Sequence, residues 1–281
     1  MRGSHADFVS AAEAARDALA ALEGGTPVAL VTVVRAPVND AVGRRLVVSA
    51  EEVRGALGSA ELDERAVEYA REALAARLCG IRELELSGGT WVLYVEPQYA
   101  APELLIVGAG HVGQALSRCA ALLGFRVTII DDRPELASRE RFPEATRVLV
   151  VSYEDPFRDV VVGPDTCVVL VTRGHKYDYD CILQLLRMEA YPAYLGMIGS
   201  RRRVWATFEA LVRDGVDPER LAQVHAPIGL DIGAETPEEI ALAIAAELVA
   251  VRRGKSGGRL SEKERVLDRL AAARGTEQGG E

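Results

Sequence analysis

Three glycines at fixed spacing, Gly108, Gly110 and Gly113, have the pattern that holds a phosphate group against the polypeptide backbone. The first permits a tight turn, the second lets a pyrophosphate approach, and the third lets a helix pack closely on the preceding strand. Free N–H groups at the start of that helix would bind the anion. About 20 residues further on, Asp131 and Asp132 supply a carboxylate for a ribose hydroxyl. These residues together indicate a dinucleotide-binding site.

The residues around the glycines predict the elements that such a site requires. An apolar run at 104–107 predicts a strand, and apolar side chains recur at helical spacing from Val112 to Leu123. A G-x-G-x-x-G pattern alone is weak evidence, but a strand before it, a helix after it and an acid downstream make it specific. We therefore expect a strand, a glycine turn and a helix in direct succession.

Further loops should lie at the same edge of the sheet as the glycine turn. We expect strands at 104–107, 126–130, 146–151, 166–172 and 193–197, with a sixth candidate at 222–225. In the usual doubly wound order the fourth strand lies beside the first, and ligands bind beyond the carboxyl ends of both. The candidate ligand-binding residues are Gly108, Gly110, His111, Gly113, Asp131, Asp132, Thr172, Arg173, Gly174, His175, Gly199, Ser200, Arg201, Arg202, Gly229, Asp231 and Glu235.

Several of these residues also have a simpler interpretation. His175 is the candidate catalytic residue, because a histidine at the strand end beside the glycine loop is well placed for proton transfer or ligand contact. His111 is more often a solvated residue at a helix start. Asp131 is a candidate ribose ligand, whereas Asp132 and the arginine after it could form a local ion pair. Of the three arginines at 201–203, we expect one or two to face the ligand and one to be solvated.

The composition narrows the class of protein. The net charge of -9 over 281 residues argues against an extended nucleic-acid surface. The four cysteines lie far apart in sequence without a C-x-x-C pair, so we expect neither a metal site nor a disulfide framework. No apolar stretch reaches the roughly 20 residues that a membrane span needs. We expect a cytoplasmic protein with small charged ligands or protein partners.

The chain divides into two α/β domains and a tail. Residues 1–97 predict a small α/β domain with helices starting after Ser10 and Ser59 and strands at 28–34, 45–48, 81–86 and 90–95. Pro97 and Pro102 bracket a linker. Residues 102–254 carry the doubly wound parallel sheet, with helices beginning near His111, Tyr177, Ser200 and Pro237. Residues 255–281 form a polar tail with one helical stretch from Ser261.

Five segments together resemble the xanthine dehydrogenase accessory family, often called XdhC/CoxI: 108–113, 131–133, 172–178, 198–202 and 227–240. The resemblance implies a Rossmann-like second domain. It further implies a bacterial maturation factor that binds molybdenum cofactor, presents it to a cysteine desulfurase for sulfuration, and passes it to the apoenzyme of a molybdenum hydroxylase of the xanthine or carbon monoxide dehydrogenase type. The first domain is divergent: 36–40 and 55–63 replace the glycine-rich segments that family members typically carry.

Two other functions fit the glycine pattern. An NAD(P)-dependent oxidoreductase would use His175 as acid or base and Asp131 to select NAD over NADP. A regulatory nucleotide-sensing module would bind the same ligands and form a homodimer. An accessory protein needs no covalent chemistry, and the sequence has no nucleophile and base with a recognisable local signature. We therefore expect a cofactor carrier rather than an enzyme.

Overall fold

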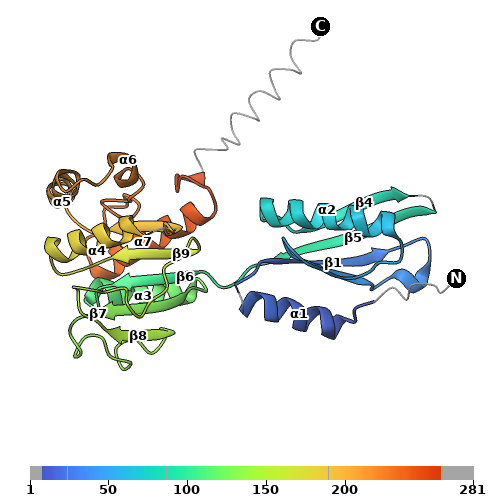
Figure 1. Ribbon diagram of the computed structural model, residues 1–281, viewed down its shortest axis with the longest axis horizontal. Coiled ribbons are helices and arrows are strands. Elements are labelled where there is room, and N and C mark those ends of the chain that lie inside the picture. The colour runs from blue at the N-terminus through green and yellow to red at the C-terminus, as the bar shows by residue number, and fades with distance from the viewer. Residues whose placement is uncertain (1–7, 24, 87, 189, 261–281) are drawn as a thin grey trace, which may run out of the picture. The chain divides into compact units, whose positions relative to one another are not determined.

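The computed structural model describes residues 8–260 except Gly24, Ser87 and Glu189. The chain forms two compact units, Met1–Ala100 and Ala101–Glu281 (Figure 1). The helix that the sequence predicts from Ser261 lies outside the described residues. Each unit has its own sheet and its own apolar core.

The first unit is a five-stranded antiparallel sheet with a helix on each face (Figure 1). Its strand order is β3-β2-β1-β5-β4. Alternate residues of β1 face opposite sides: Ala29 and Val31 pack with α2, whereas Val28 and Leu30 pack with α1. The elements are α1 (Ala11–Glu23), β1 (Val28–Arg35), η1 (Asn39–Ala41), β2 (Arg45–Val48), β3 (Val53–Gly55), α2 (Ala60–Ala76), β4 (Gly80–Leu86) and β5 (Gly89–Gln98).

The structure departs from the sequence prediction at three places in this unit. The short elements η1 and β3 were not predicted, and β5 continues through Pro97 to Gln98. Proline is tolerated there because β4 pairs with β5 only as far as Val95, so one side of β5 has no β4 partner beyond that residue. Pro97 still lies opposite Ala29 of β1.

The second unit is a five-stranded parallel sheet with helices on both faces, which confirms the predicted fold class. The helices α3 and α7 cover one face, and α4 and α5 cover the other. The elements are β6 (Glu103–Val107), α3 (His111–Leu122), β7 (Arg126–Asp131), β8 (Arg147–Val150), β9 (Thr166–Leu170), α4 (His175–Arg187), β10 (Tyr194–Met197), α5 (Arg201–Arg213), α6 (Pro218–Leu221) and α7 (Pro237–Arg252).

The strand order β10-β9-β6-β7-β8 reverses at β6. Val107 at the end of β6 pairs with Ile130 of β7 on one side and with Leu170 of β9 on the other. The loops after β6, β7 and β9 therefore leave the sheet next to one another. Ligands of doubly wound sheets bind at this reversal point.

Two elements of the second unit differ in extent from the prediction. The helix predicted from Tyr177 begins at His175, because Gly174 takes the extended conformation of an N-cap. The sixth strand predicted at 222–225 is reduced to a single bridge between Gly196 and His225. Pro227 has no N–H to continue that pairing, although Ile228 still donates to the Met197 carbonyl at 3.1 Å.

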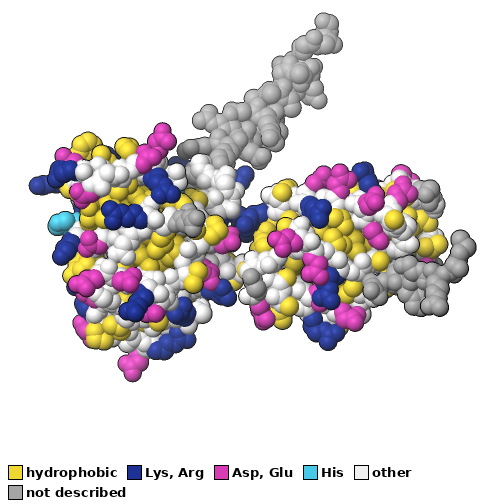
Figure 2. All heavy atoms as spheres, viewed as in Figure 1, with side chains coloured by type: hydrophobic (Ala, Val, Ile, Leu, Met, Phe, Trp, Pro, Cys, Tyr) yellow, Lys and Arg dark blue, Asp and Glu magenta, His cyan; other side chains and the backbone are white. Residues whose placement is uncertain are grey.

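The charge of the surface and the length of the helices concern binding to nucleic acids and to membranes. On the described part of the face in Figure 2, Lys and Arg side chains are interspersed with Asp and Glu side chains, so this face has no continuous basic surface for a nucleic acid. Among the residues that the structure describes, no helix has the length and apolar character needed to cross a membrane.

Candidate functional site

The glycine loop at 108–113 joins β6 to α3 through two very close backbone approaches. Gly108 has φ +120°, and a Cβ on it would lie 2.5 Å from the Val171 carbonyl oxygen. A Cβ on Gly113 would lie 2.1 Å from the Gly108 carbonyl oxygen. Only glycine fits at either position. These two residues hold the loop against β9 and bring the start of α3 close to the strand.

Gly110 is different, because nothing lies within 4 Å of a Cβ built on it. It is the N-cap of α3 and supplies no side-chain cap. The first N–H groups of a helix have no partner within the helix and carry partial positive charge. The open space at Gly110 is therefore suited to an anion that needs backbone donors, such as a phosphate group.

Asp131 lies at the end of β7 and is fully buried. Its carboxylate accepts hydrogen bonds from the Ala109 N–H at 2.7 Å and from Arg133 through the backbone N–H, Nε and Nη2 at 3.0, 2.8 and 2.9 Å. Burial alone would raise the pKa of Asp131, but the bonds from Arg133 and Ala109 outweigh burial and lower it to about 2. In this structure Asp131 stabilises the glycine loop, and neither carboxylate oxygen is free to accept a hydrogen bond from a ribose hydroxyl.

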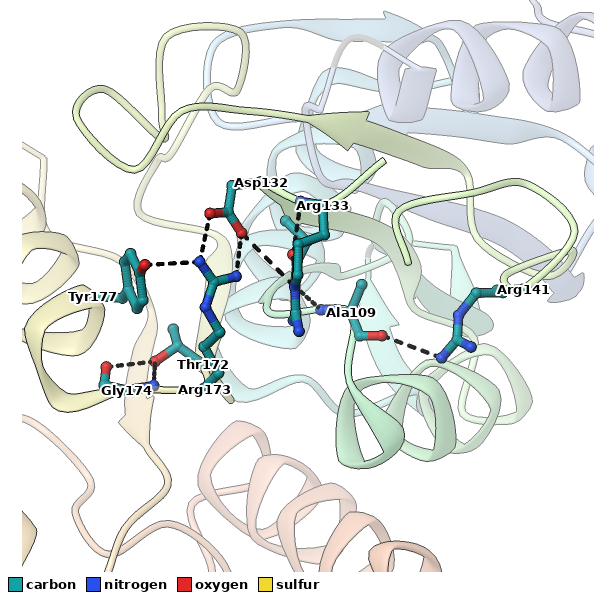
Figure 3. A network of polar contacts seen from close by, with 9 residues as sticks. Ala109, Asp132, Arg133, Arg141, Thr172, Arg173, Gly174 and Tyr177 are labelled. Carbon is teal, nitrogen blue, oxygen red and sulfur yellow. Dashed lines mark hydrogen bonds and ion pairs between the residues drawn. The ribbon is translucent and has the colours of Figure 1, made fainter. Parts of the chain in front are cut away.

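Asp132, the next residue, forms an ion pair across the reversal point with Arg173 (Figure 3). The Nη1 and Nη2 atoms of Arg173 donate to the two carboxylate oxygens of Asp132 at 2.5 and 2.7 Å. Nη2 also donates to the Tyr177 hydroxyl at 2.7 Å, and the guanidinium lies 4.5 Å from the centre of the Tyr177 ring. The structure thus brings together two predicted site residues from the loops after β7 and β9.

A buried network behind this pair was missed by sequence reasoning. Asp178 of α4 is fully buried and accepts hydrogen bonds from the Thr172 hydroxyl, at 2.5 Å, and from Arg203 of α5. Burial raises the pKa of Asp178, and the bonds from Thr172 and Arg203 offset this only in part. The network ties the loop after β9 to the start of α5. Asp178 lies in the first turn of the predicted helix, on its apolar side, and this was the sequence signal that could have revealed the network.

The predicted arginines at the start of α5 separate into different roles. Ser200 is the N-cap, and its hydroxyl accepts from the Arg203 N–H at 3.3 Å. Arg202 is exposed, whereas Arg203 faces Asp178. Arg201 lines an apolar hollow of about 530 Å³ on α5 together with Trp205 and Phe208. This hollow is lined by α5 together with Ala226 and Pro227, and no residue of the glycine loop lines it.

Arg141 is a second basic residue at the glycine loop that the sequence did not single out. Its Nη2 donates to the Ala109 carbonyl at 3.3 Å (Figure 3). Its own carbonyl accepts from Gln114 of α3 at 2.9 Å. Its Nε is buried without a hydrogen-bond partner among the described residues. The glycine loop is therefore contacted by a guanidinium group that has an unused donor.

The loop before α7 is held by Glu247. This carboxylate accepts from the Gly229 N–H, from the Tyr194 hydroxyl at 2.9 Å and from His225 Nδ1 at 2.8 Å. Burial alone would raise its pKa, but the bonds from His225, Gly229 and Tyr194 lower it. The backbone N–H of Gly229 is thus engaged in a hydrogen bond within the protein.

Four further predicted site residues lie on the surface. His111 and His175 are exposed at the first positions of α3 and α4. Asp231 and Glu235 are exposed in the loop before α7, and in the described structure their side chains have no hydrogen bond to the glycine loop. No cluster of three or more His, Cys, Asp or Glu residues suited to a metal ion occurs among the residues described.

The parallel sheet and the glycine loop at its reversal point define a protein with a Rossmann-type domain. Residues 104–248, more than half of the chain, match the family model of the XdhC Rossmann domain. Residues 21–83 match the model of the XdhC and CoxI family. The chain therefore belongs to the XdhC family.

Three curated relatives match parts of this chain. The chain is 35% identical over 172 residues to the uncharacterized protein YqeB of Escherichia coli K12 and 30% identical over 159 residues to a probable xanthine dehydrogenase subunit of Bacillus subtilis 168. It is 29% identical over 149 residues to the molybdenum cofactor insertion chaperone PaoD of E. coli K12. These matches cover 61%, 57% and 53% of this chain but only 31%, 44% and 40% of the relatives.

A solved structure described as a xanthine dehydrogenase from Bacillus halodurans has a similar fold. The match covers 87% of this chain and 98% of that chain, with a TM-score of 0.50 and 20% sequence identity. At this level of identity the likeness concerns the fold.

Proposed function

We propose that this protein binds molybdenum cofactor and delivers it to the apoenzyme of a molybdenum hydroxylase of the xanthine or carbon monoxide dehydrogenase type. The observation that carries the proposal is the open space at Gly110, at the N-terminus of α3 in an XdhC-family chain. Molybdenum cofactor is a phosphorylated pterin, and its phosphate matches the donors that such a helix start offers. Arg141 adds a guanidinium to the same loop.

Two relatives support the same role. PaoD carries the name of a molybdenum cofactor insertion chaperone, and the B. subtilis relative that of a probable xanthine dehydrogenase subunit. We propose that the cofactor is sulfurated by a cysteine desulfurase while it is held in this site. Within the site, Gly110 and Gly113 would present backbone donors, and Arg173, with Arg202 at the start of α5, would neutralise negative charge. The role requires binding and release, without a covalent intermediate on this chain.

The NAD-linked oxidoreductase is less well supported. Asp131, which would bond the ribose in such an enzyme, is buried and fully bonded to Ala109 and Arg133, so it cannot make that contact itself. His175, which would act as acid or base, is exposed at the start of α4.

The test is to purify the protein from cells that make molybdopterin and to assay the bound ligand as a fluorescent oxidised pterin. We expect pterin in the wild-type protein and a clear reduction in a Gly110→Ala variant, since the added methyl group would occupy the space over the loop. A Gly163→Ala variant, at an equally open position before β9, controls for glycine substitution. Stoichiometric NAD(H) without pterin would contradict the proposal.

A further inference from the structure

The ion pair between Asp132 and Arg173 crosses the end of the central strand of the second unit. Asp132 follows β7 and Arg173 follows the end of β9, while β6 lies between these two strands. The glycine loop leaves the sheet at the end of β6. A guanidinium and a carboxylate therefore meet across the strand end from which the proposed phosphate site begins (Figure 3).

This pair is accessible to solvent, unlike the adjacent Asp131. The side chains of Asp132 and Arg173 are 26% and 37% exposed, whereas that of Asp131 is 0% exposed. Because both side chains contact solvent, each can be solvated again when a ligand takes its partner, at a lower cost than for a buried pair. Asp132 is therefore the acid at the end of β7 whose carboxylate can be released to a ligand.

Arg173 is held ready for an anion. Its guanidinium lies over the Tyr177 ring and donates to the Tyr177 hydroxyl, so its position does not depend on Asp132 alone. A guanidinium binds phosphate in the same bidentate geometry that it uses for a carboxylate. A phosphate at the start of α3 would compete directly with Asp132 for these donors.

We propose that ligand binding exchanges this ion pair: the ligand phosphate takes Arg173, and the released Asp132 carboxylate accepts hydrogen bonds from hydroxyl or amino groups of the same ligand. The inference rests on the proposed function, because it needs a phosphorylated ligand at α3. It also predicts which ligands the site prefers. Free phosphate would leave the Asp132 carboxylate beside an anion with only a long contact to Arg133 Nε, at 3.9 Å, whereas a phosphorylated molecule with hydrogen-bond donors satisfies both charged residues.

The experiment measures the binding of three probes by titration calorimetry: AMP, which carries a ribose diol, its 2′,3′-dideoxy analogue, and inorganic pyrophosphate. The wild-type protein should bind AMP at least about tenfold more tightly than the dideoxy analogue, the lower end of the effect of one hydrogen bond to a charged group. In Asp132→Asn this preference should disappear, and pyrophosphate should bind about fivefold more tightly because Arg173 has lost its competitor.

Two control variants distinguish this exchange from nonspecific effects of a substitution on ligand affinity. Glu103→Gln removes a carboxylate from a second exposed ion pair, with Arg126, at the opposite ends of β6 and β7, and it should leave all three affinities unchanged. Tyr177→Phe keeps the ring beneath Arg173 but removes the hydroxyl to which Arg173 donates, so it should weaken the binding of all three probes while keeping the preference for the diol. Thermal unfolding monitored by circular dichroism checks that each variant is folded.

The outcomes are distinct. An unchanged diol preference in Asp132→Asn, or an equal loss of affinity for all three probes, would overturn the exchange while leaving the phosphate site intact. Wild-type protein that binds none of the probes, and carries no pterin from cells that make it, would overturn the proposed function and this inference together.

Discussion

The carboxylate of Asp131 lies 2.7 Å from the backbone nitrogen of Ala109 and accepts its hydrogen bond inside the protein. This bond joins the end of β7 to the glycine loop after β6. Arg133 saturates the remaining acceptor positions of the same carboxylate. The residue that a sequence motif marks as a ligand contact is here part of the support for the loop.

We predict that Asp131→Asn lowers the free energy of unfolding by about 2 kcal/mol at pH 7. The pKa of Asp131 is lowered from 3.8 to about 2 in the folded protein. Its stabilising effect is therefore present above pH 4 and is lost as the pH falls toward 2. Urea unfolding at a series of pH values measures this, with the exposed Asp155→Asn as control. Equal acid dependence in both variants would contradict the assignment.

Two glycines of the same loop should respond in opposite ways to alanine. Gly113→Ala places a Cβ 2.1 Å from the Gly108 carbonyl oxygen, so we expect it to destabilise the second unit by several kcal/mol or prevent folding. Gly110→Ala has open space and a negative φ, so it should fold normally and lose affinity for phosphorylated ligands. Thermal unfolding and pyrophosphate titration separate the two effects. A stable Gly113→Ala protein would show that α3 can move away from β6.

Glu247→Ala should destabilise the protein by about 2 kcal/mol, because it leaves the buried Tyr194 hydroxyl and the partly buried His225 and Gly229 without their shared acceptor. The pKa of Glu247 is lowered in the folded state, so its contribution is present above its usual pKa and is lost as the pH falls below it. Glu238→Ala, at an exposed position of α7, is the matched control. Limited proteolysis should show faster cleavage at 227–236 in Glu247→Ala only.

The four cysteines should differ sharply in their reactivity toward a thiol reagent. Cys79 is exposed, Cys119 is partly buried, and Cys167 and Cys181 are buried. Burial raises the pKa of Cys119, Cys167 and Cys181, that of Cys167 to about 11, which reduces the fraction of reactive thiolate. We expect one fast-reacting thiol in the native protein, absent from Cys79→Ser. Rapid reaction of more than one thiol before unfolding would refute this exposure pattern.

Local sequence signals predicted much of the fold correctly. The strand at 104–107, the glycine turn and the helix after it occur as predicted, because apolar periodicity and glycine spacing are properties of short stretches of chain. Thr236 and Glu239 form the predicted capping box of α7 for the same reason. The prediction of a sixth strand was wrong, because an apolar pattern alone does not show whether the backbone of a neighbouring strand continues the hydrogen-bonded pairing.

The sequence by itself determined the parallel α/β architecture of the second unit and the position of the glycine loop at its strand reversal, since periodicity and glycine spacing act over short stretches of chain. Only the tertiary structure decided which charged residues meet. Asp132 and Arg173 are 41 positions apart, and Asp178 and Arg203 are 25 apart. The strand order brings these residues together, so burial and charge pairing, rather than local pattern, separate the buried Asp131 from the accessible Asp132.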